Sequence, residues 1–199
     1  MKVIAITGGI GSGKSIVARC VKAMGYPVYD CDSRAKALMD SNPAIIEAIG
    51  REIGSHCIDA CRGTIDRAAL ASTVFSDADA LARLNAIVHG AVRADIKEQM
   101  ERLRSAGLRS LAFIETAILY QSEIDRMVDA VWEVTAPRAI RIERVMSRNG
   151  LTAGEVEARI DSQDTYKSDR RHHSVNYIVN DGFMPILPAV VQLIREAES

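Results

Sequence analysis

The stretch VIAITGGIGSGKS, residues 3–15, decides the fold of this chain because it joins a short apolar run to a glycine-rich loop. Residues 2–7 are mostly β-branched or apolar and predict a strand. Residues 15–24 carry apolar side chains at helical spacing and predict a helix. The loop between them fills the pattern GxxxxGK followed by Ser or Thr with Gly8, Gly13, Lys14 and Ser15. A strand, such a loop and a helix together form a phosphate-binding P-loop.

The residue types of this loop each have a physical role. Glycines let the backbone turn tightly around an anion and direct its N–H groups inward. Lys14 brings positive charge to the β- and γ-phosphates, and the Ser15 hydroxyl is a ligand for Mg²⁺. The helix directs its positive end at the same phosphates. The motif therefore predicts a site for a nucleoside triphosphate and Mg²⁺, with a glycine-rich turn that binds nothing as the alternative.

Length and charge narrow the class of protein. The 199 residues can bury one core with inserted subdomains. Lys and Arg total 25 against 26 acidic residues, so no global positive field favours nucleic acid. The start of the chain lacks the pattern of a signal peptide, and no stretch approaches the roughly 18 apolar residues of a membrane span. We expect a cytoplasmic monomer or small homo-oligomer that binds neither nucleic acid nor a membrane.

The four cysteines show no CxxC spacing and are expected to be free thiols in a reducing compartment. His56, Cys57 and Cys61 lie close enough in sequence to raise a structural zinc site as the alternative, although a fourth ligand is not evident.

Short, fully apolar strands alternate with helical patterns along the rest of the chain. We predict strands at residues 2–7, 27–29, 110–114, 130–134 and 177–179. Helical patterns dominate residues 33–107, of which the longest is 77–106, and recur at 138–148 and 185–197. Thr152 and Glu155 form a capping box that starts one more helix. This order predicts a P-loop NTPase of the α/β class, with three α/β/α layers around a five-stranded parallel sheet.

The same order suggests how the chain divides. Residues 1–32, 108–137 and 172–199 are expected to form the nucleotide-binding core. Residues 33–107 form a helical insertion that binds the phosphate acceptor, and residues 138–171 form a helical lid. Ligands bind parallel sheets at the carboxyl ends of the strands, which is where Gly8, Asp30, Asp32 and Glu115 fall.

Three features favour a small-molecule kinase over a GTPase or a motor ATPase. The chain is short, it contains no NKxD or TKxD stretch, and Asp30 and Asp32 follow the second predicted strand. A carboxylate there could accept the proton of an attacking hydroxyl group. The alternative is that Asp32 only caps a helix starting near Ser33.

The predicted lid carries Arg141, Arg144 and Arg148 on one side of a helix, at spacings of three and four. Arginines so spaced could reach phosphates when the lid closes and excludes water. Because acidic residues are mixed into the same segment, a solvated pair of charged helices is the alternative.

An ordered set of motifs identifies a family that the chain resembles over almost its whole length. These motifs are TGGIGSGKS at 7–15, YDCDSRAK at 29–36, GTIDRAALASTVF at 63–75, NAIVHGAV at 85–92, RVMSRNGLT at 144–152 with RIDSQ at 159–163, and NYIVNDG at 176–182. Together they resemble dephospho-CoA kinase, in which the first motif is widely shared and the ordered set is specific.

The resemblance implies transfer of the γ-phosphoryl group of ATP to the ribose 3′-hydroxyl of dephospho-CoA, with Mg²⁺. It implies Asp32 as the general base, Lys14 as a phosphate clamp and Arg144 and Arg148 as groups that stabilise the transferring phosphoryl. Residues implied to bind ATP are Gly11, Ser12, Gly13, Lys14, Ser15, Ile16 and Asn180, with Asn180 near the adenine and Ser15 on the metal. Residues implied to bind the acceptor are Asp32, Lys36, Arg67, His89 and Glu115.

The chain departs from the family pattern at some positions. Gly90 stands where proline is usual after His89, and ETAILYQ at 115–121 stands where DxPLLFE is commoner, so that Glu115 takes the carboxylate role. These departures keep open the alternative of a nucleotide sensor without turnover. Another P-loop nucleoside or nucleotide kinase is the second alternative, and it would take a small acceptor and need fewer helices between the second and third strands.

Overall fold

The computed structural model describes residues 1–107, 109–165 and 171–199. These residues form two compact units, one of Met1–Asp30 with Arg102–Ser199 and the other of Cys31–Glu101.

The first unit contains a five-stranded parallel sheet in the order β2-β5-β1-β6-β7. Its strands are β1 Lys2–Thr7, β2 Val28–Asp30, β5 Leu111–Glu115, β6 Ala130–Thr135 and β7 Val175–Val179. Its helices are α1 Lys14–Ala23, η2 Ile124–Met127, α6 Arg138–Asn149, α7 Ala153–Thr165 and α8 Ile186–Glu198. The predicted three-layer α/β fold with five parallel strands is confirmed.

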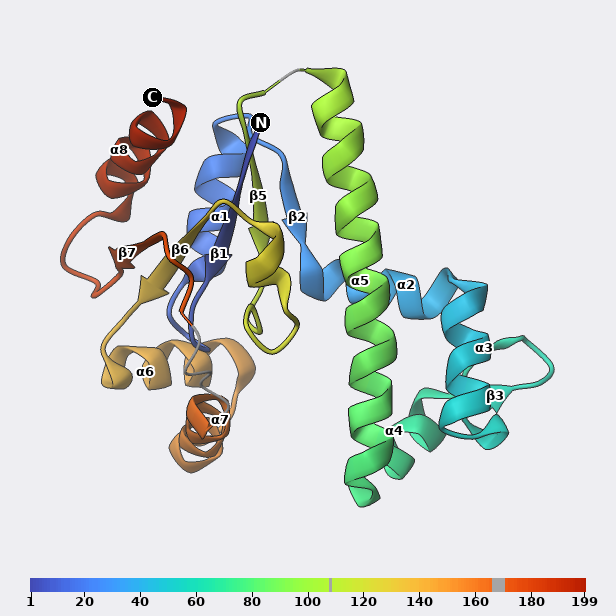
Figure 1. The fold of residues 1–199 in the computed structure, drawn as a ribbon. Coiled ribbons are helices and arrows are strands. Elements are labelled where there is room, and N and C mark those ends of the chain that lie inside the picture. Colours follow the sequence, from blue (N-terminus) through green and yellow to red (C-terminus); the bar gives the residue numbers. More distant parts are fainter. Residues whose placement is uncertain (108, 166–170) are drawn as a thin grey trace. The chain divides into compact units, whose positions relative to one another are not determined.

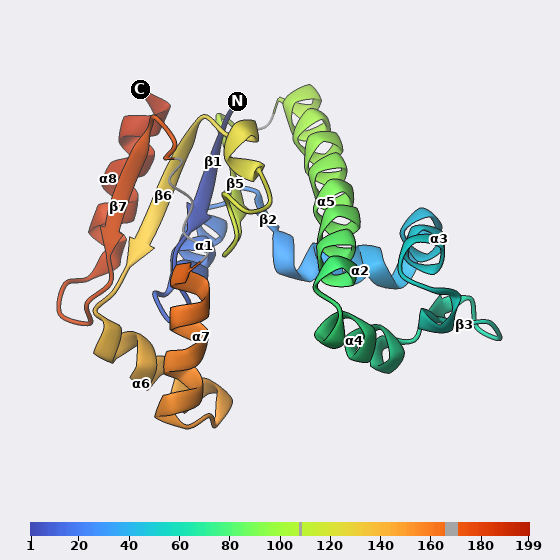
Figure 2. The same ribbon diagram turned by 60° about the horizontal axis from the view of Figure 1, so that its bottom comes forward.

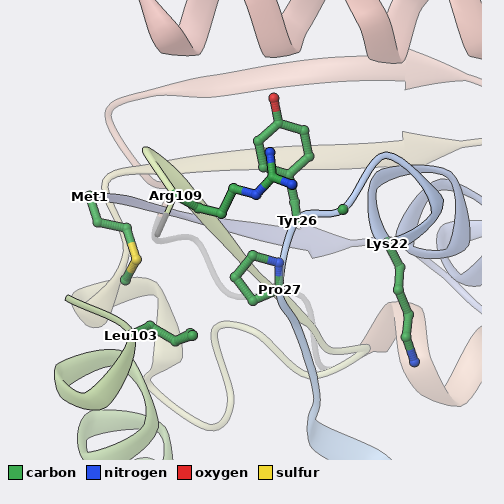
Figure 3. A pocket seen from close by; sticks show the side chains of 7 residues that line it. Met1, Lys22, Tyr26, Pro27, Leu103 and Arg109 are labelled. Carbon is green, nitrogen blue, oxygen red and sulfur yellow. The ribbon is translucent and has the colours of Figure 1, made fainter. Parts of the chain in front are cut away.

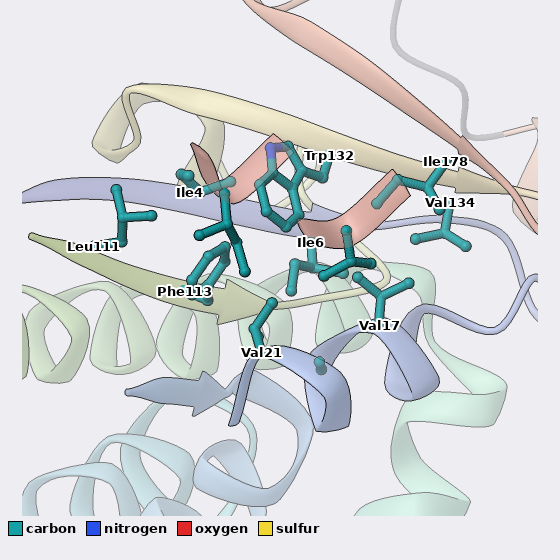
Figure 4. Packing of buried hydrophobic residues seen from close by; sticks show 12 residues of the cluster. Ile4, Ile6, Val17, Val21, Leu111, Phe113, Trp132, Val134 and Ile178 are labelled. Atoms are coloured by element: carbon teal, nitrogen blue, oxygen red, sulfur yellow. The ribbon is translucent and has the colours of Figure 1, made fainter. Parts of the chain in front are cut away.

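Burial of whole strands explains why this sheet forms. Residues 3–7 of β1 are all buried, as are residues 111–114 of β5, so side chains on both faces of the sheet are covered. On one face, α1 and α8 pack against the sheet (Figure 1). Phe113 and Trp132 lie at the centre of this cluster with ring centroids 5.0 Å apart (Figure 4). The buried sheet therefore fixes where its strands end and where the loops after them begin.

The second unit is mainly helical. It contains α2 Cys31–Ser41, α3 Pro43–Glu52, η1 Ser55–Cys57, α4 Arg67–Ser76 and most of α5 Ala78–Ala106. A two-stranded antiparallel ribbon, β3 Ile58–Asp59 with β4 Thr64–Ile65, was not predicted because two-residue strands leave no periodic pattern. A small core of Ile45, Ile49, Cys57 and Leu70 holds the unit together.

Some predicted boundaries were wrong by a few residues. Strand β2 begins at Val28 rather than Pro27, whose carbonyl still accepts a hydrogen bond from Phe113 N at 2.9 Å. Strand β7 begins at Val175, two residues before the predicted start. Helix α2 begins at Cys31, so Asp32 lies within the first helical turn and does not cap a helix that starts near Ser33.

No helix in the described ranges is long and apolar enough to cross a membrane. His56 contacts Thr73 and Cys57, and no group of three metal-ligating side chains occurs in the part of the chain that the structure describes.

Candidate phosphate-binding site

The P-loop follows β1 directly and ends at the first residue of α1. Gly8, Gly11 and Gly13 have φ angles of 153°, 79° and 97°, a region that other residues rarely adopt. Ser12 N donates to Gly9 O at 3.0 Å and Ile16 N to Gly13 O at 2.9 Å, which closes the loop and starts the helix. The predicted strand, loop and helix are thus all present.

Close contacts also require glycine in this loop. A Cβ atom at Gly13 would overlap Asn180 Nδ2, and one at Gly8 would overlap the carbonyl oxygen of Val134. A Cβ atom at Gly11 would lie 2.5 Å from the carbonyl oxygen of Arg141. The loop is therefore in close contact with β6, with α6 and with the end of β7.

Asn180, the residue after β7, connects the edge of the sheet to the P-loop. Its side chain is buried, and Nδ2 donates to Ser12 O at 2.9 Å. Its backbone N–H donates to Thr135 O at 2.8 Å, which continues the ladder of β6 with β7. The side-chain amide of Asn180 therefore stabilises the turn of the P-loop at Ser12. The sequence did not reveal this role because the two residues are 168 positions apart.

Arg144 contacts Asn180 from α6. Its Nη1 donates to the backbone oxygen of Asn180 at 3.1 Å and its Nη2 to the side-chain oxygen at 3.2 Å. Next to Asn180, the backbone N–H groups of Met184 and Phe183 lower the pKa of the Asp181 carboxyl, and Arg144 lowers it further. The predicted residues Arg144 and Asn180 thus lie together beside the P-loop.

Carboxylates lie at the same edge of the sheet. In the strand register, Glu115 at the end of β5 pairs with Ile6 of β1 and with Asp30 of β2. Ser15 Oγ donates to Glu115 Oε1 at 2.5 Å. A hydroxyl and a carboxylate oxygen are thus adjacent at the start of α1, and both are oxygen ligands of the kind that could hold Mg²⁺.

The three arginines of α6 do not share one environment. Arg141 Nε donates to Ile10 O at 2.9 Å within the P-loop. Arg148 is exposed and its Nε donates to Asn149 Oδ1 at 2.8 Å, at the far end of the helix. The capping box predicted for α7 is confirmed, since Thr152 N donates to Glu155 Oε2 at 2.8 Å. Residues 166–170 of the predicted lid lie outside the described residues.

The residues predicted to hold the acceptor, other than Glu115, lie in the second unit. Asp32 and Lys36 are exposed and four residues apart, so they share one face of α2. Arg67 forms a 2.5 Å ion pair with Asp40. His89 is half-buried in α5, where burial lowers the pKa of its imidazole and Arg93 lowers it further.

A separate pocket lies at the amino ends of the strands (Figure 3). Its volume is about 320 Å³, and it is lined by Met1, Lys22, Gly25, Tyr26, Pro27, Leu103 and Arg109. The guanidinium carbon of Arg109 lies 5.6 Å from the centre of the Tyr26 ring, whose hydroxyl donates to Glu198 at 2.9 Å. None of the predicted site residues lines this pocket.

Comparisons with known proteins bear on the chemistry of the P-loop. The dephospho-CoA kinase family matches residues 2–185. A dephospho-CoA kinase of Porphyromonas gingivalis is 38% identical over 195 residues, which cover 98% of this chain and 94% of that protein.

Two solved structures share the fold of this chain. The crystal structure of a Thermus thermophilus protein is 32% identical with a TM-score of 0.76, covering 98% of this chain and 96% of that one. Dephospho-CoA kinase from Campylobacter jejuni shares the fold with a TM-score of 0.69 at 24% identity, again over 98% and 96% of the two chains.

Proposed function

Because the chain belongs to the dephospho-CoA kinase family, a kinase family that transfers phosphate to dephospho-CoA, we propose the reaction in detail. The γ-phosphoryl group of ATP passes to the ribose 3′-hydroxyl of dephospho-CoA, in the last step of coenzyme A biosynthesis. The observation that carries the proposal is the P-loop after β1, whose Ser15 hydroxyl is hydrogen-bonded to Glu115 at the carboxyl edge of the sheet.

On the donor side, the backbone of residues 11–16 surrounds the phosphates and Lys14 neutralises their charge. Ser15 and Glu115 supply oxygen ligands that fit Mg²⁺. When bound, Mg²⁺ neutralises charge that develops between the β- and γ-phosphates. Asn180 keeps the loop in shape through Ser12 and lies on the side where we expect the adenine.

On the acceptor side, the 3′-hydroxyl oxygen forms the new bond to the γ-phosphorus while the bond to the bridging oxygen of ADP breaks. Asp32 accepts the hydroxyl proton. Residues 33–107 bind dephospho-CoA, with Lys36, Arg67 and His89 among its contacts. The exposed face that Asp32 and Lys36 share on α2 supports this assignment, because it presents a base and a positive charge together.

Arg144 and Arg148 stabilise the charge of the transferring phosphoryl group. Residues 138–171 act as the lid that excludes water, while residues 1–32, 108–137 and 172–199 form the nucleotide-binding core. We expect the enzyme to act in the cytoplasm, as a monomer or small homo-oligomer, on these two small molecules and with no nucleic acid or membrane as a partner.

The test incubates purified protein and Mg²⁺-ATP with dephospho-CoA, with a panel of nucleosides and nucleotides, or with no acceptor, and follows products by mass spectrometry. We expect dephospho-CoA alone to gain one phosphate, and Lys14→Met to abolish the gain. Phosphorylation of a panel member in its place would make the protein a nucleoside or nucleotide kinase. ATP binding without any product would make it a sensor.

A further inference from the structure

Ile10, in the middle of the P-loop, is held by two helices that lie far from it in sequence. Its backbone N–H donates to Gln163 Oε1 of α7 at 2.7 Å. Its carbonyl oxygen accepts from Arg141 Nε of α6 at 2.9 Å. Both hydrogen-bonding groups of one P-loop residue are therefore satisfied by α6 and α7. These two helices follow β6 and lie next to each other (Figure 2).

The side chain of Ile10 is attached to the same helices. It packs against the buried cluster of Val145, Val156 and Ile160, which forms the core between α6 and α7. Ile10 is the residue of the P-loop that belongs to this cluster. The helix pair thus contacts Ile10 through its N–H, its carbonyl and its side chain.

Arg141 contacts the P-loop by packing as well as by its hydrogen bond to Ile10. A Cβ atom at Gly9 would lie 2.5 Å from Arg141 Nη2, so the guanidinium lies directly against the loop backbone. This Nη2 atom is buried and has no hydrogen-bond partner among the described residues. Burying a hydrogen-bond donor without a partner is unfavourable. The other contacts of Arg141 with the loop must therefore offset this unfavourable free energy.

Gln163 links the loop to a second segment. Its Nε2 donates to the carbonyl oxygen of Ala117 at 3.4 Å, and Ala117 follows Glu115 at the end of β5. One side-chain amide therefore connects the P-loop to the segment that carries the carboxylate bonded to Ser15.

We propose that Arg141 and Gln163 are positioning residues, which hold the peptide of Ile10 so that the P-loop keeps the shape that accepts phosphates. They act through Ile10, and the affinity for nucleotide depends on the packing of α6 and α7 against it. This inference deepens the proposed function, because the loop concerned is the one that binds ATP there.

The test measures binding of Mg²⁺ with the non-hydrolysable ATP analogue AMP-PNP by calorimetry, so its outcome does not depend on which acceptor is phosphorylated. The leucine side chain of Gln163→Leu cannot accept a hydrogen bond from Ile10 N–H. We therefore expect this variant to bind AMP-PNP about 10-fold more weakly, a difference of about 1.4 kcal/mol. Gln192→Leu makes the same change on α8, where the side chain donates a hydrogen bond to Glu196, and this variant should bind AMP-PNP like the unchanged protein.

A second readout follows the amide of Ile10 itself by NMR hydrogen exchange. We expect this amide to exchange at least about 10-fold faster in Gln163→Leu, and to remain protected in Gln163→Glu, whose carboxylate can accept the same bond. If Gln163→Leu does not fold, Arg141→Met tests the attachment from α6 with the same expected loss of affinity. Binding within twofold of the unchanged protein in the folded variant would overturn the proposal.

Discussion

Asn180 offers the sharpest test of how the phosphate site is supported. Replacing it by alanine removes the hydrogen bond from Nδ2 to Ser12 O and the one from Arg144 Nη2 to Oδ1. The first is a buried neutral bond of about 1 kcal/mol, and the second involves a charged donor and contributes about 1.5–3 kcal/mol. We therefore expect Asn180→Ala to lower the free energy of unfolding by about 2–4 kcal/mol.

For a chain of this length, that loss corresponds to a Tm about 4–16 °C lower in a thermal unfolding scan. Because the P-loop loses its hydrogen bond from Asn180 to Ser12, binding of AMP-PNP should weaken in the same variant. The matched control is Asn176→Ala on the same edge strand, β7, where the side chain makes no hydrogen bond to another described residue. If Asn180→Ala and Asn176→Ala lowered the Tm by the same amount, the argument that Asn180 stabilises the loop would be refuted.

Three further predictions concern other parts of the site. Gly13→Ala must adopt φ near 97° and overlap Asn180, so it should lose nucleotide binding in calorimetry, whereas Gly63→Ala at φ 64° meets no atom within 4 Å and should retain it. Asp32→Asn should keep the KM for ATP while lowering kcat by about 10²–10⁴ in steady-state assays; unchanged kcat would exclude Asp32 as the base. Burial lowers the pKa of His89 in the fold, so below pH 6.5 the unfolded chain takes up the proton first and stability falls. Chemical denaturation at pH 7.5 and at pH 5.5 measures how much the free energy of unfolding falls between them. This fall should be smaller in His89→Gln than in the unchanged protein, and an equal fall would contradict the prediction.

The strands were the part of the fold that the sequence predicted best. Residues 2–7 form a strand as expected, because a short β-branched run that is apolar on both faces suits a strand covered on both faces of a sheet. The ends of strands were less certain. Val175 extends β7 because it pairs with Val131, a contact that local composition does not reveal.

The sequence predicted the type and position of the P-loop, but not the residues that hold it in place. The spacing of Gly8, Gly13, Lys14 and Ser15 fixed its position, since the geometry of the turn depends on local residues. The contacts of Asn180 and Gln163 with the loop span more than 150 residues, so only the fold could reveal them.

The arginines of α6 illustrate the same limit. A spacing of three and four residues predicts neighbouring positions on the helix, but it does not say which arginine contacts the loop. The register of α6 against the P-loop puts Arg141 on Ile10 and Arg144 on Asn180, and it leaves Arg148 exposed. The catalytic roles given to Arg144, Arg148 and Asp32 stay predictions.

The central claim is that this chain phosphorylates the ribose 3′-hydroxyl of dephospho-CoA, and NMR of the product tests it most directly. The purified enzyme is incubated with Mg²⁺-ATP and dephospho-CoA, and the phosphorus spectrum is recorded with proton correlation to the ribose. We predict one new phosphomonoester signal correlated with the 3′ proton, formed in step with ADP. A signal at another position, or ADP formation without any phosphorylated acceptor, would contradict the account.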